Sequence, residues 1–256
     1  MSRDRDRAGA GRKAAIADRI TFATDRSGRP VVVKLEPDAA ARDAEVRALR
    51  HWDGRGAVRV LDVDEAHGAI VLERLVPGTS LREETVHDPE AAEIAAGVIR
   101  TLHAAAPPFP ALPHIRDWMA VLDAPKRALA EDLCRRSSGD VVLHGDLHHD
   151  NILRAGAGDW LAIDPKGVIG PREAEPAAFL RNPRDELLAS ADPVGLSRTR
   201  ARVMARVLVQ EPSLLLGWAY VLGVLAAIWA AEDGAVAEEV ARASEGATVL
   251  GEAWRG

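Results

Sequence analysis

The chain has 256 residues, 47% hydrophobic and 28% charged, with a formal net charge of −6. These values are typical of one globular domain, or of two small lobes that share a core. The acidic balance provides no broad basic surface, so we expect no nucleic-acid partner; it is compatible with a small cationic substrate. The single cysteine, Cys134, excludes an intrachain disulfide and a cysteine-rich zinc site, and it favours a reducing, cytoplasmic location.

Two segments bear on targeting and membranes. Residues 1–13 (MSRDRDRAGAGRK) are charged and precede no apolar signal-peptide core, so we expect a disordered, solvated tail. Residues 213–231 carry no charge and are long enough to span a bilayer. Their flanks are acidic and lack a Lys or Arg anchor, while the alanines and glycines suit close helix packing. We therefore predict a buried core helix and no membrane partner.

The first third of the chain has the pattern of strands with one helix. Four segments form the expected strands: residues 16–24, 31–35, 58–63 and 69–75. Residues 25–30 (DRSGRP) are turn-prone and predict a hairpin between the first two strands. A helix is expected from about Asp38, and Pro77-Gly78 is expected to end the strand pattern.

The remainder of the chain is expected to be mainly helical. One helix begins with Asp88 as N-cap and Pro89 in the first helical position, and a second runs from about Trp118 to Arg136. The short apolar runs 141–143 and 160–163 precede polar loops, and proline breaks divide the later helices. We predict an α+β fold with a short strand-rich lobe (residues 1–76) and a larger helical lobe (residues 77–256).

The densest cluster of polar side chains lies at residues 144–153 (HGDLHHDNIL), and Asp164 follows the next apolar run. Phosphoryl transfer from a nucleotide needs one carboxylate to accept a hydroxyl proton, and an amide with a second carboxylate to hold Mg²⁺. Asp146 and Asn151 have the spacing of Asp and Asn in the kinase loop H-R-D-L-x-x-x-N, and Asp164 falls where the Asp of D-F-G would fall. Lys34 at a strand end and Glu45 on the next helix match the phosphate-positioning pair of kinases.

These motifs resemble the aminoglycoside phosphotransferases, and most closely the branch of the streptomycin 6-phosphotransferases and hydroxyurea phosphotransferase. The likeness extends from Val31 to the C-terminus through these segments: Lys34, residues 52–56, 72–78, 144–153 and 160–183, and Trp229-Ala230. The resemblance implies a protein-kinase-like two-lobed fold. It also implies transfer of the γ-phosphate of ATP, with Mg²⁺, to a hydroxyl of an aminoglycoside such as the 6-hydroxyl of streptomycin, which inactivates the antibiotic.

The resemblance also implies roles for individual residues. Asp146 matches the catalytic base, and His144 is expected to brace its loop. Asn151 and Asp164 match the Mg²⁺ ligands, and Lys34 with Glu45 matches the pair that positions the phosphates. Residues 73–76, which include Glu73 and Leu75, correspond to the interlobe linker whose backbone holds adenine.

Streptomycin carries guanidinium groups, for which paired carboxylates are suitable partners. Glu173 and Glu175 are the first candidates because they follow the second metal ligand, with Asp117 and Asp185 as further candidates. Trp118 could line the same cleft. We expect a monomer that binds a small-molecule aminoglycoside.

One departure from the kinase pattern lies before Lys34. A kinase-like lobe normally has a strand, a glycine-rich loop and a second strand before the lysine strand, but only 33 residues precede Lys34. The first strand is therefore expected to be missing, and Gly9-Ala10-Gly11 holds the one glycine pair available to cover phosphates.

Several alternatives stay open at this point. His144, His148 and His149 with Asp146 and Asp150 could bind a transition metal, as in a metallophosphohydrolase. A short N-terminal lobe would also suit a kinase-like binding module without catalysis, and the substrate could be hydroxyurea or another small hydroxylated metabolite. The remaining histidines (His51, His67, His87, His103 and His114) are expected at the surface or at helix ends, and Arg198–Arg206 on a solvated helix face.

Overall fold

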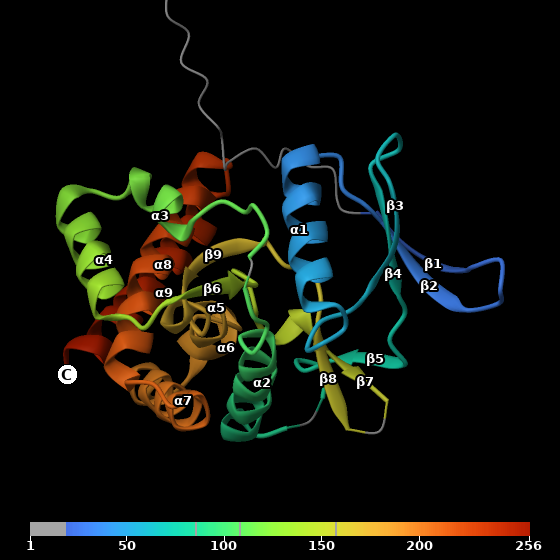
Figure 1. The fold of residues 1–256 in the computed structure, drawn as a ribbon. Coiled ribbons are helices and arrows are strands. Elements are labelled where there is room, and N and C mark those ends of the chain that lie inside the picture. Colours follow the sequence, from blue (N-terminus) through green and yellow to red (C-terminus); the bar gives the residue numbers. More distant parts are fainter. Residues whose placement is uncertain (1–18, 85, 108, 157) are drawn as a thin grey trace, which may run out of the picture.

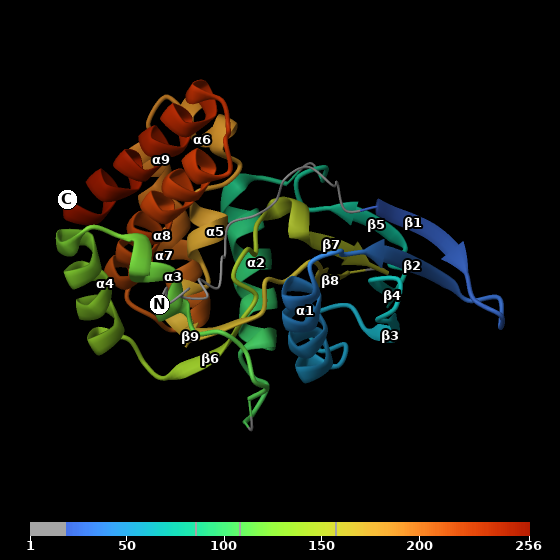
Figure 2. The same ribbon diagram turned by 90° about the horizontal axis from the view of Figure 1, so that it is seen from above.

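The computed structural model describes residues 19–84, 86–107, 109–156 and 158–256. A strand-rich N-terminal part lies beside a larger, mainly helical C-terminal part, so the fold is α+β as predicted (Figures 1 and 2). The predictions for the tail at residues 1–13, for Gly9-Ala10-Gly11 and for the start of the first strand at residues 16–18 lie outside the described residues.

An antiparallel sheet and one helix make up the N-terminal part. The sheet has the order β1-β2-β4-β3 and consists of β1 (Arg19–Thr24), β2 (Pro30–Leu35), β3 (Val60–Asp64) and β4 (Ala69–Glu73). The predicted hairpin turn is present, and the Asp25 carboxylate accepts hydrogen bonds from the backbone N–H groups of Ser27 and Arg29 at 2.8 and 2.9 Å. Helix α1 (Ala39–Trp52) is N-capped by Asp38 and lies beside the sheet (Figure 1).

The chain does not leave β structure at Pro77-Gly78, which corrects the prediction. Residues Pro77–Ser80 form β5, which pairs with β7 (Ile152–Ala155) in a second sheet completed by β8 (Asp159–Ala162). Pro77 is tolerated because β5 is an edge strand of this sheet, where one side of the backbone needs no partner. Strand β5 thus pairs with β7, a strand that follows it by about 70 residues in the sequence.

The C-terminal part contains the remaining helices and a two-stranded sheet. Its elements are α2 (Asp88–Leu102), α3 (Ile115–Trp118), η1 (Met119–Val121), α4 (Ala124–Arg136), β6 (Asp140–Leu143), η2 (His149–Asn151), β9 (Val168–Pro171), η3 (Arg172–Ala174), α5 (Ala177–Leu180), α6 (Arg184–Ala189), α7 (Pro193–Leu208), α8 (Pro212–Glu232) and α9 (Ala237–Arg255). Strand β9 pairs with β6, so the segment after Asp164 is not purely helical as predicted.

Two predicted helix boundaries are wrong for local reasons. The helix expected from Trp118 to Arg136 is interrupted, because Asp123 adopts an extended conformation and N-caps α4 through a hydrogen bond from the Lys126 N–H at 3.0 Å. His87, rather than Asp88, is the N-cap of α2. Asp88 instead occupies the first helical position, where a negative charge is favourable, and its carboxylate pairs with Arg200.

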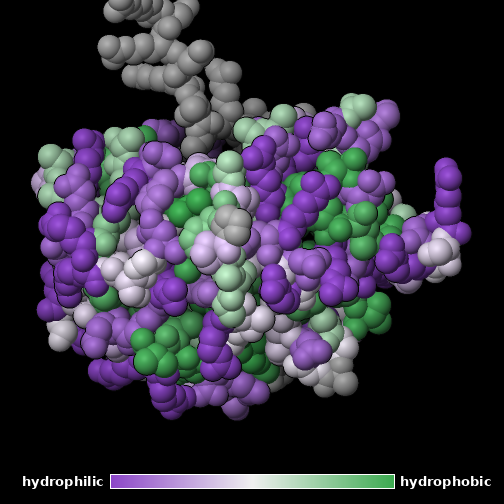
Figure 3. All heavy atoms as spheres, in the orientation of Figure 1, coloured by the Kyte–Doolittle hydropathy of each residue, from purple (hydrophilic) through white to green (hydrophobic). Residues whose placement is uncertain are grey.

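Helix α8 is the core helix that the sequence predicts. It packs against α4, α5, α7 and α9, and Leu215, Trp218 and Leu225 are fully buried. It is long and apolar enough to cross a membrane, and it is the one such helix in the described part of the chain. However, 61% of its most apolar 18-residue stretch is buried inside the protein. Each buried Leu of this kind contributes about 1.5–3 kcal/mol. The face of the molecule in Figure 3 is mainly hydrophilic, with apolar patches divided by polar side chains.

Helix α1 is fastened to the C-terminal part at two places. Gly167 has φ +64°, and a Cβ atom there would collide with the carbonyl oxygen of Ala44, so glycine is required for this close approach. The buried Trp52 ring stacks on His144, with ring centroids 6.4 Å apart and planes 18° apart. These contacts place the helix that carries Glu45 directly against the loop that carries Asp146.

Candidate active site

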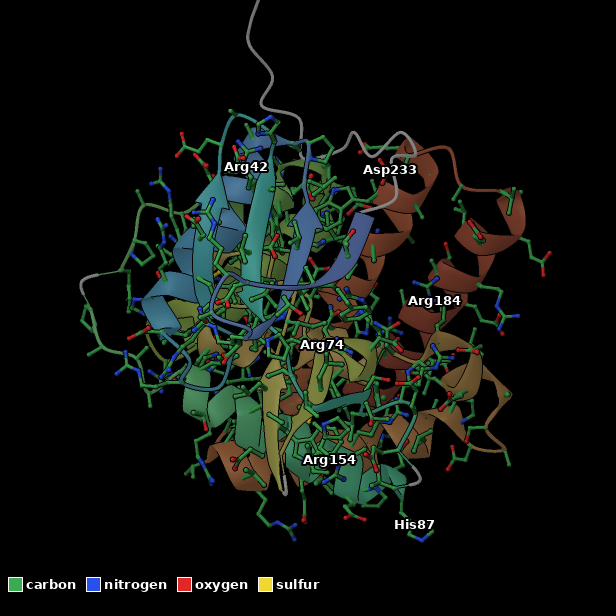
Figure 4. All side chains as sticks on the ribbon, turned by 90° about the vertical axis from the view of Figure 1, so that its right-hand side faces the viewer. Arg42, Arg74, His87, Arg154, Arg184 and Asp233 are labelled. Carbon is green, nitrogen blue, oxygen red and sulfur yellow. The ribbon has the colours of Figure 1, made fainter. Side chains whose placement is uncertain are left out.

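A cavity of about 340 Å³ opens where the N-terminal sheet meets β5 and β7. Its lining is partly apolar, with Ile20, Phe22, Val32, Val58, Leu72, Leu75, Pro77, Leu153 and Ile163. The other lining residues are Lys34, Glu45, Glu73, Arg74, Gly78, Asn151 and Asp164. Figure 4 shows Arg74 where the sheet meets the strands below it, and the Arg74 guanidinium lies 4.5 Å from the centroid of the Phe22 ring. The cavity thus combines a surface for a planar apolar group with charged groups.

Lys34 joins three segments of the chain inside this cavity. Its Nζ donates a 2.8 Å hydrogen bond to Glu45 Oε2 on α1 and a second hydrogen bond to Asp164 Oδ1, which follows β8. Burial alone would lower the pKa of Lys34, but the carboxylates of Glu45 and Asp164 outweigh burial and raise it. Lys34 therefore stays charged and contacts both carboxylates. The contact with Glu45 is the pair that the sequence predicted.

Asp164 has a backbone conformation that is uncommon outside glycine, with φ +58°. Burial would raise the pKa of its carboxyl, but the Lys34 ammonium outweighs burial and lowers the pKa, so Asp164 is ionised. Strained residues of this kind gather at functional sites, where the surrounding structure holds them. The Asp164 side chain lines the cavity and pairs with Lys34 there.

The loop between β6 and β7 is held by its own polar groups. His144 is fully buried; its Nε2 donates to the Ile163 carbonyl at 2.7 Å and its Nδ1 accepts from the Asp146 N–H at 3.3 Å, so the ring is neutral. Burial lowers the pKa of His144, which favours the same neutral form. Asn151 Nδ2 donates to the Asp146 carbonyl at 2.9 Å. The Asp146 backbone is thus fixed on both sides.

The Asp146 side chain has a partner that the sequence analysis missed. Arg181 Nη2 donates to Asp146 Oδ1 at 3.0 Å. Arg181 follows the buried helix α5, and 35 residues separate it from Asp146 in the sequence. The available signal was an arginine directly after the apolar run Ala177–Leu180, where an unpaired cation would not be tolerated.

Asn151 and Asp164 fit a divalent cation. The Asn151 Nδ2 atom is used by the Asp146 carbonyl, which leaves its Oδ1 as the atom available to a metal. Amide and carboxylate oxygens are the donors that Mg²⁺ prefers, usually together with the phosphates of a nucleotide. Both residues line the cavity. The predicted Mg²⁺ ligands are therefore brought together.

The transition-metal alternative finds no support in the described residues. They contain no group of three or more His, Cys, Asp and Glu side chains arranged to bind a metal ion. His149 stacks on Phe179 with ring centroids 4.0 Å apart, and His148 Nδ1 accepts the Asp150 N–H at 3.3 Å. These rings stabilise the loop.

The two glutamates predicted to bind substrate are bonded inside the protein, which corrects that prediction. Glu175 is buried and accepts hydrogen bonds from the backbone N–H groups of His144 and Gly145 at 2.6 and 3.0 Å. Glu173 is buried as well and accepts from the N–H and the hydroxyl of Ser138 at 3.0 and 2.6 Å. Glu175 therefore supports the Asp146 loop, and the Glu173 carboxylate is enclosed beside Ser138, with its Oε2 unpaired among the described residues but shielded from solvent.

Among the further substrate-binding candidates Asp117, Asp185 and Trp118, Trp118 is the one that borders the Asp146 loop. Asp117 closes a capping box at α3 by accepting from the His114 N–H at 3.0 Å. Asp185 lies on the surface of α6, where Arg82 donates to it at 3.1 and 3.3 Å. A Cβ atom added to Gly145 would lie 3.1 Å from the Trp118 ring. The Trp118 ring also makes an edge contact with the Trp229 ring, with the two ring centroids 5.4 Å apart.

His103 lies at a helix end, as predicted, because it is the C-cap of α2, whereas Arg200, predicted on a solvated face, is buried. The His103 ring lies 3.6 Å from Glu175, with its side chain almost fully enclosed. Arg200 is only 1% exposed, donates to both oxygens of Asp88 at 2.6 to 3.0 Å and donates to the Asn182 carbonyl at 2.9 Å. The stretch Arg198–Arg206 is therefore not a single solvated face.

Comparisons with known proteins identify relatives of this chain. A family model described as aminoglycoside/hydroxyurea antibiotic resistance kinase matches residues 13–234. Over 250 residues the chain is 32% identical to streptomycin 6-kinase of Streptomyces glaucescens, covering 90% of this chain and 78% of that protein. It is 33% identical to streptomycin 3''-kinase of Klebsiella pneumoniae over 224 residues, covering 80% and 81%.

Solved structures show the same fold at low sequence identity. Amicoumacin kinase hAmiN, in complex with AMP-PNP, Ca²⁺ and Ami, is 12% identical with a TM-score of 0.63, covering 92% of this chain and 86% of that one. The match places the two-part architecture among the kinase-like folds. The family model, which spans most of the sequence, and the identity to streptomycin 6-kinase lead to one conclusion: the chain belongs to the aminoglycoside/hydroxyurea antibiotic resistance kinase family.

Proposed function

We propose that this chain transfers the γ-phosphate of ATP to a hydroxyl group of an aminoglycoside, and specifically to the 6-hydroxyl of streptomycin. One observation carries the proposal: Lys34, Asn151 and Asp164 line a single cavity, and the Asp146 loop is hydrogen-bonded to Asn151. A base, a cation for phosphates and two metal ligands are the parts that phosphoryl transfer requires. A reaction that consumes ATP also fits the cytoplasmic location suggested by the sequence.

The cavity fits a nucleoside triphosphate. Its apolar residues, among them Val32 and Leu72, provide surfaces for a base, and Lys34 provides the cation for phosphates. Glu73 and Leu75 also line the cavity, which supports a role for the backbone of residues 73–76 in holding adenine. Mg²⁺ bound by Asn151 and Asp164 would neutralise charge on the phosphates.

The chemical step then requires only one proton acceptor. The drug hydroxyl oxygen forms a bond to the γ-phosphorus, and the bond from that phosphorus to the bridging oxygen breaks, with its electron pair leaving on ADP. The hydroxyl proton passes to the Asp146 carboxylate, whose backbone is fixed by His144 and Asn151. The protein contributes position and charge, and forms no covalent bond to the phosphoryl group.

Streptomycin is the favoured drug because of the relatives, and the structure adds the aromatic wall beside the Asp146 loop. The curated relatives named above act on the 6 and 3'' positions of streptomycin, by name. Trp118, in contact with Trp229, could pack against the drug, and guanidinium groups bind favourably over tryptophan rings. Hydroxyurea is the second candidate substrate, because the matching family description includes it.

A direct assay tests the proposal. The purified chain is incubated with Mg²⁺ and ATP, and ADP release is measured with streptomycin, hydroxyurea or kanamycin as acceptor. We expect streptomycin-dependent ADP release, a gain of one phosphoryl group by mass spectrometry, and placement at the 6-hydroxyl by phosphorus NMR. Transfer to the 3''-hydroxyl would contradict the proposed site of phosphorylation, while streptomycin would remain the substrate. Drug binding without transfer to any acceptor would favour a binding module.

A further inference from the structure

We propose that Arg181 is a positioning residue that fixes one oxygen of the Asp146 carboxylate and so directs the other oxygen to the substrate hydroxyl. This inference rests on the proposed function. It starts from the 3.0 Å hydrogen bond between Arg181 Nη2 and Asp146 Oδ1. The bond joins a guanidinium to a carboxylate, and such charge-assisted pairs are the strongest hydrogen bonds of protein side chains.

The Arg181 side chain is enclosed and has a single acidic partner. Its exposed fraction is 17%, and that of Asp146 is 26%. In the part of the chain that the structure describes, no other carboxylate pairs with Arg181. Burial disfavours the charged form of Arg181 and lowers its pKa, while Asp146 opposes this effect. The guanidinium remains charged because the pKa of arginine is very high, so it needs the Asp146 carboxylate.

The backbone that carries Arg181 is anchored from two directions. The Arg181 N–H donates to the Ala177 carbonyl at 3.3 Å, and the Asn182 side chain donates to the Ala178 carbonyl at 2.9 Å. Arg200 donates to the Asn182 carbonyl at 2.9 Å and is itself held by Asp88. Arg181 therefore projects from a fixed point, and its guanidinium defines where Asp146 Oδ1 lies.

A fixed Oδ1 has a consequence for the other oxygen. The Asp146 backbone is held by His144 and Asn151, and its side chain is held by Arg181. No described residue donates a hydrogen bond to Asp146 Oδ2. When the hydroxyl oxygen attacks phosphorus and the bridging bond breaks, Oδ2 is the atom that takes the hydroxyl proton. Without Arg181 the carboxylate could rotate about its terminal bond, and fewer encounters would place an oxygen within reach of that proton.

The test compares Arg181→Ala with a matched control, Arg184→Met. Arg184 lies three residues further on, near Gly246, so the control removes the same charge from the same region without touching Asp146. We expect Arg181→Ala to lower kcat by about 10²-fold, with KM for ATP and for streptomycin close to wild type. The Arg184→Met variant is expected to keep the wild-type kcat. Melting curves establish that both variants are folded.

Two further measurements separate positioning from a general structural effect. Guanidinium or methylguanidinium at millimolar concentration should restore part of kcat in Arg181→Ala, and should not raise the rate of wild type. In an Asp146→Asn background, adding Arg181→Ala should lower kcat little further, because Arg181 acts through Asp146. Lost kcat with no rescue, together with a full additional loss in the Asp146→Asn background, would overturn the proposal.

The remaining outcomes are also decisive. Wild-type kcat in a folded Arg181→Ala variant would overturn the positioning role while the proposed function stands. If Arg181→Ala does not fold, Arg181→Gln takes its place in the double-variant comparison, and the same additivity decides. A wild-type chain that transfers no phosphoryl group to any acceptor would overturn the proposed function and, with it, the role of Arg181.

Discussion

Two groups of paired charged residues in this protein differ in whether they line a cavity. Lys34, Glu45 and Asp164 are paired with one another and line a cavity. Arg200 and Asp88 are also paired, but they lie where α7 packs against α2. Both groups follow the rule that a buried charge needs a partner. The presence of an ion pair therefore does not identify a functional charge. A paired charge that also lines a cavity is the better candidate.

The same comparison separates the glutamates predicted to bind substrate from the cavity-facing charges. Glu175 and Glu173 lie near the catalytic loop in space, but both Glu175 oxygens accept from backbone N–H groups, and the Glu173 carboxylate is enclosed and accepts from Ser138. A carboxylate that already accepts strong hydrogen bonds has little to offer a cationic ligand. Substitutions of these residues should separate cavity-facing charges, which affect activity, from inward charges, which affect stability.

The largest expected effect is that of Asp146→Asn. The amide cannot accept the hydroxyl proton, so turnover should fall by about 10² to 10⁴. Nucleotide binding, measured by calorimetry, should remain, because Asp146 does not line the cavity as Lys34 does. Turnover near the wild-type value would show that another group accepts the proton.

Lys34→Met removes the cation of the cavity-facing group. The proposed loss of a charge aimed at the phosphates should lower kcat by about 10² to 10³. KM for the drug should change little, since the cavity is assigned to the nucleotide. A variant with unchanged kcat and KM for ATP would place Lys34 among the structural ion pairs; Lys126→Met, which breaks a surface pair with Asp123, is the control.

Arg200→Met removes the cation of the inward group. We expect the free energy of unfolding to fall by about 3 kcal/mol, since the pair is buried but Asp88 keeps some access to water. Urea denaturation measures this change. Folded Arg200→Met protein should bind ATP with wild-type affinity. Weakened ATP binding without loss of stability would show that the Arg200 pair serves nucleotide binding and not stability.

Glu175→Gln tests whether this residue supports the loop or binds the drug. The amide keeps one acceptor but turns a donor toward a backbone N–H, so stability should fall by about 1–3 kcal/mol. KM for streptomycin should stay within the error of the wild-type value. A raised KM with unchanged stability would restore the substrate role that the sequence predicted.

Asp185→Asn should have the smallest effect. Its pair with Arg82 is exposed, and pairs of this kind contribute about 0–1 kcal/mol. Neither kcat nor KM for streptomycin is expected to change in initial-rate assays. A clear rise in KM would mean that α6 contributes an acidic side chain to the drug site after all.

The parts of the site that the sequence predicts well are those defined by short spacings. Asp146, Asn151 and Asp164 lie on loops after strands, and residues five apart on such a loop meet in the same place. The strands, the hairpin turn at Asp25 and the core helix α8 were also predicted, because local turn chemistry and hydrophobicity determine them.

Apart from the two helix boundaries, the errors concern contacts between distant segments. Arg82 pairs with Asp185 across 103 residues and Arg200 with Asp88 across 112, and nothing in either local sequence indicates these partners. Pro77-Gly78 has the composition of a break, yet the strand Ile152–Ala155 provides a partner for it. Arg181 was missed for the same reason, since its carboxylate lies in a different loop.

The close approach of Gly167 to Ala44 limits how this protein can be regulated. A helix that swings away from its sheet would separate Glu45 from Lys34, and such motion could act as an off switch. Here α1 is anchored to the segment after Asp164 by backbone contact and to His144 by the Trp52 ring. These contacts hold α1 in the position that pairs Glu45 with Lys34. Activity should then depend on the amount of protein made and on the supply of nucleotide and antibiotic, and not on an allosteric signal.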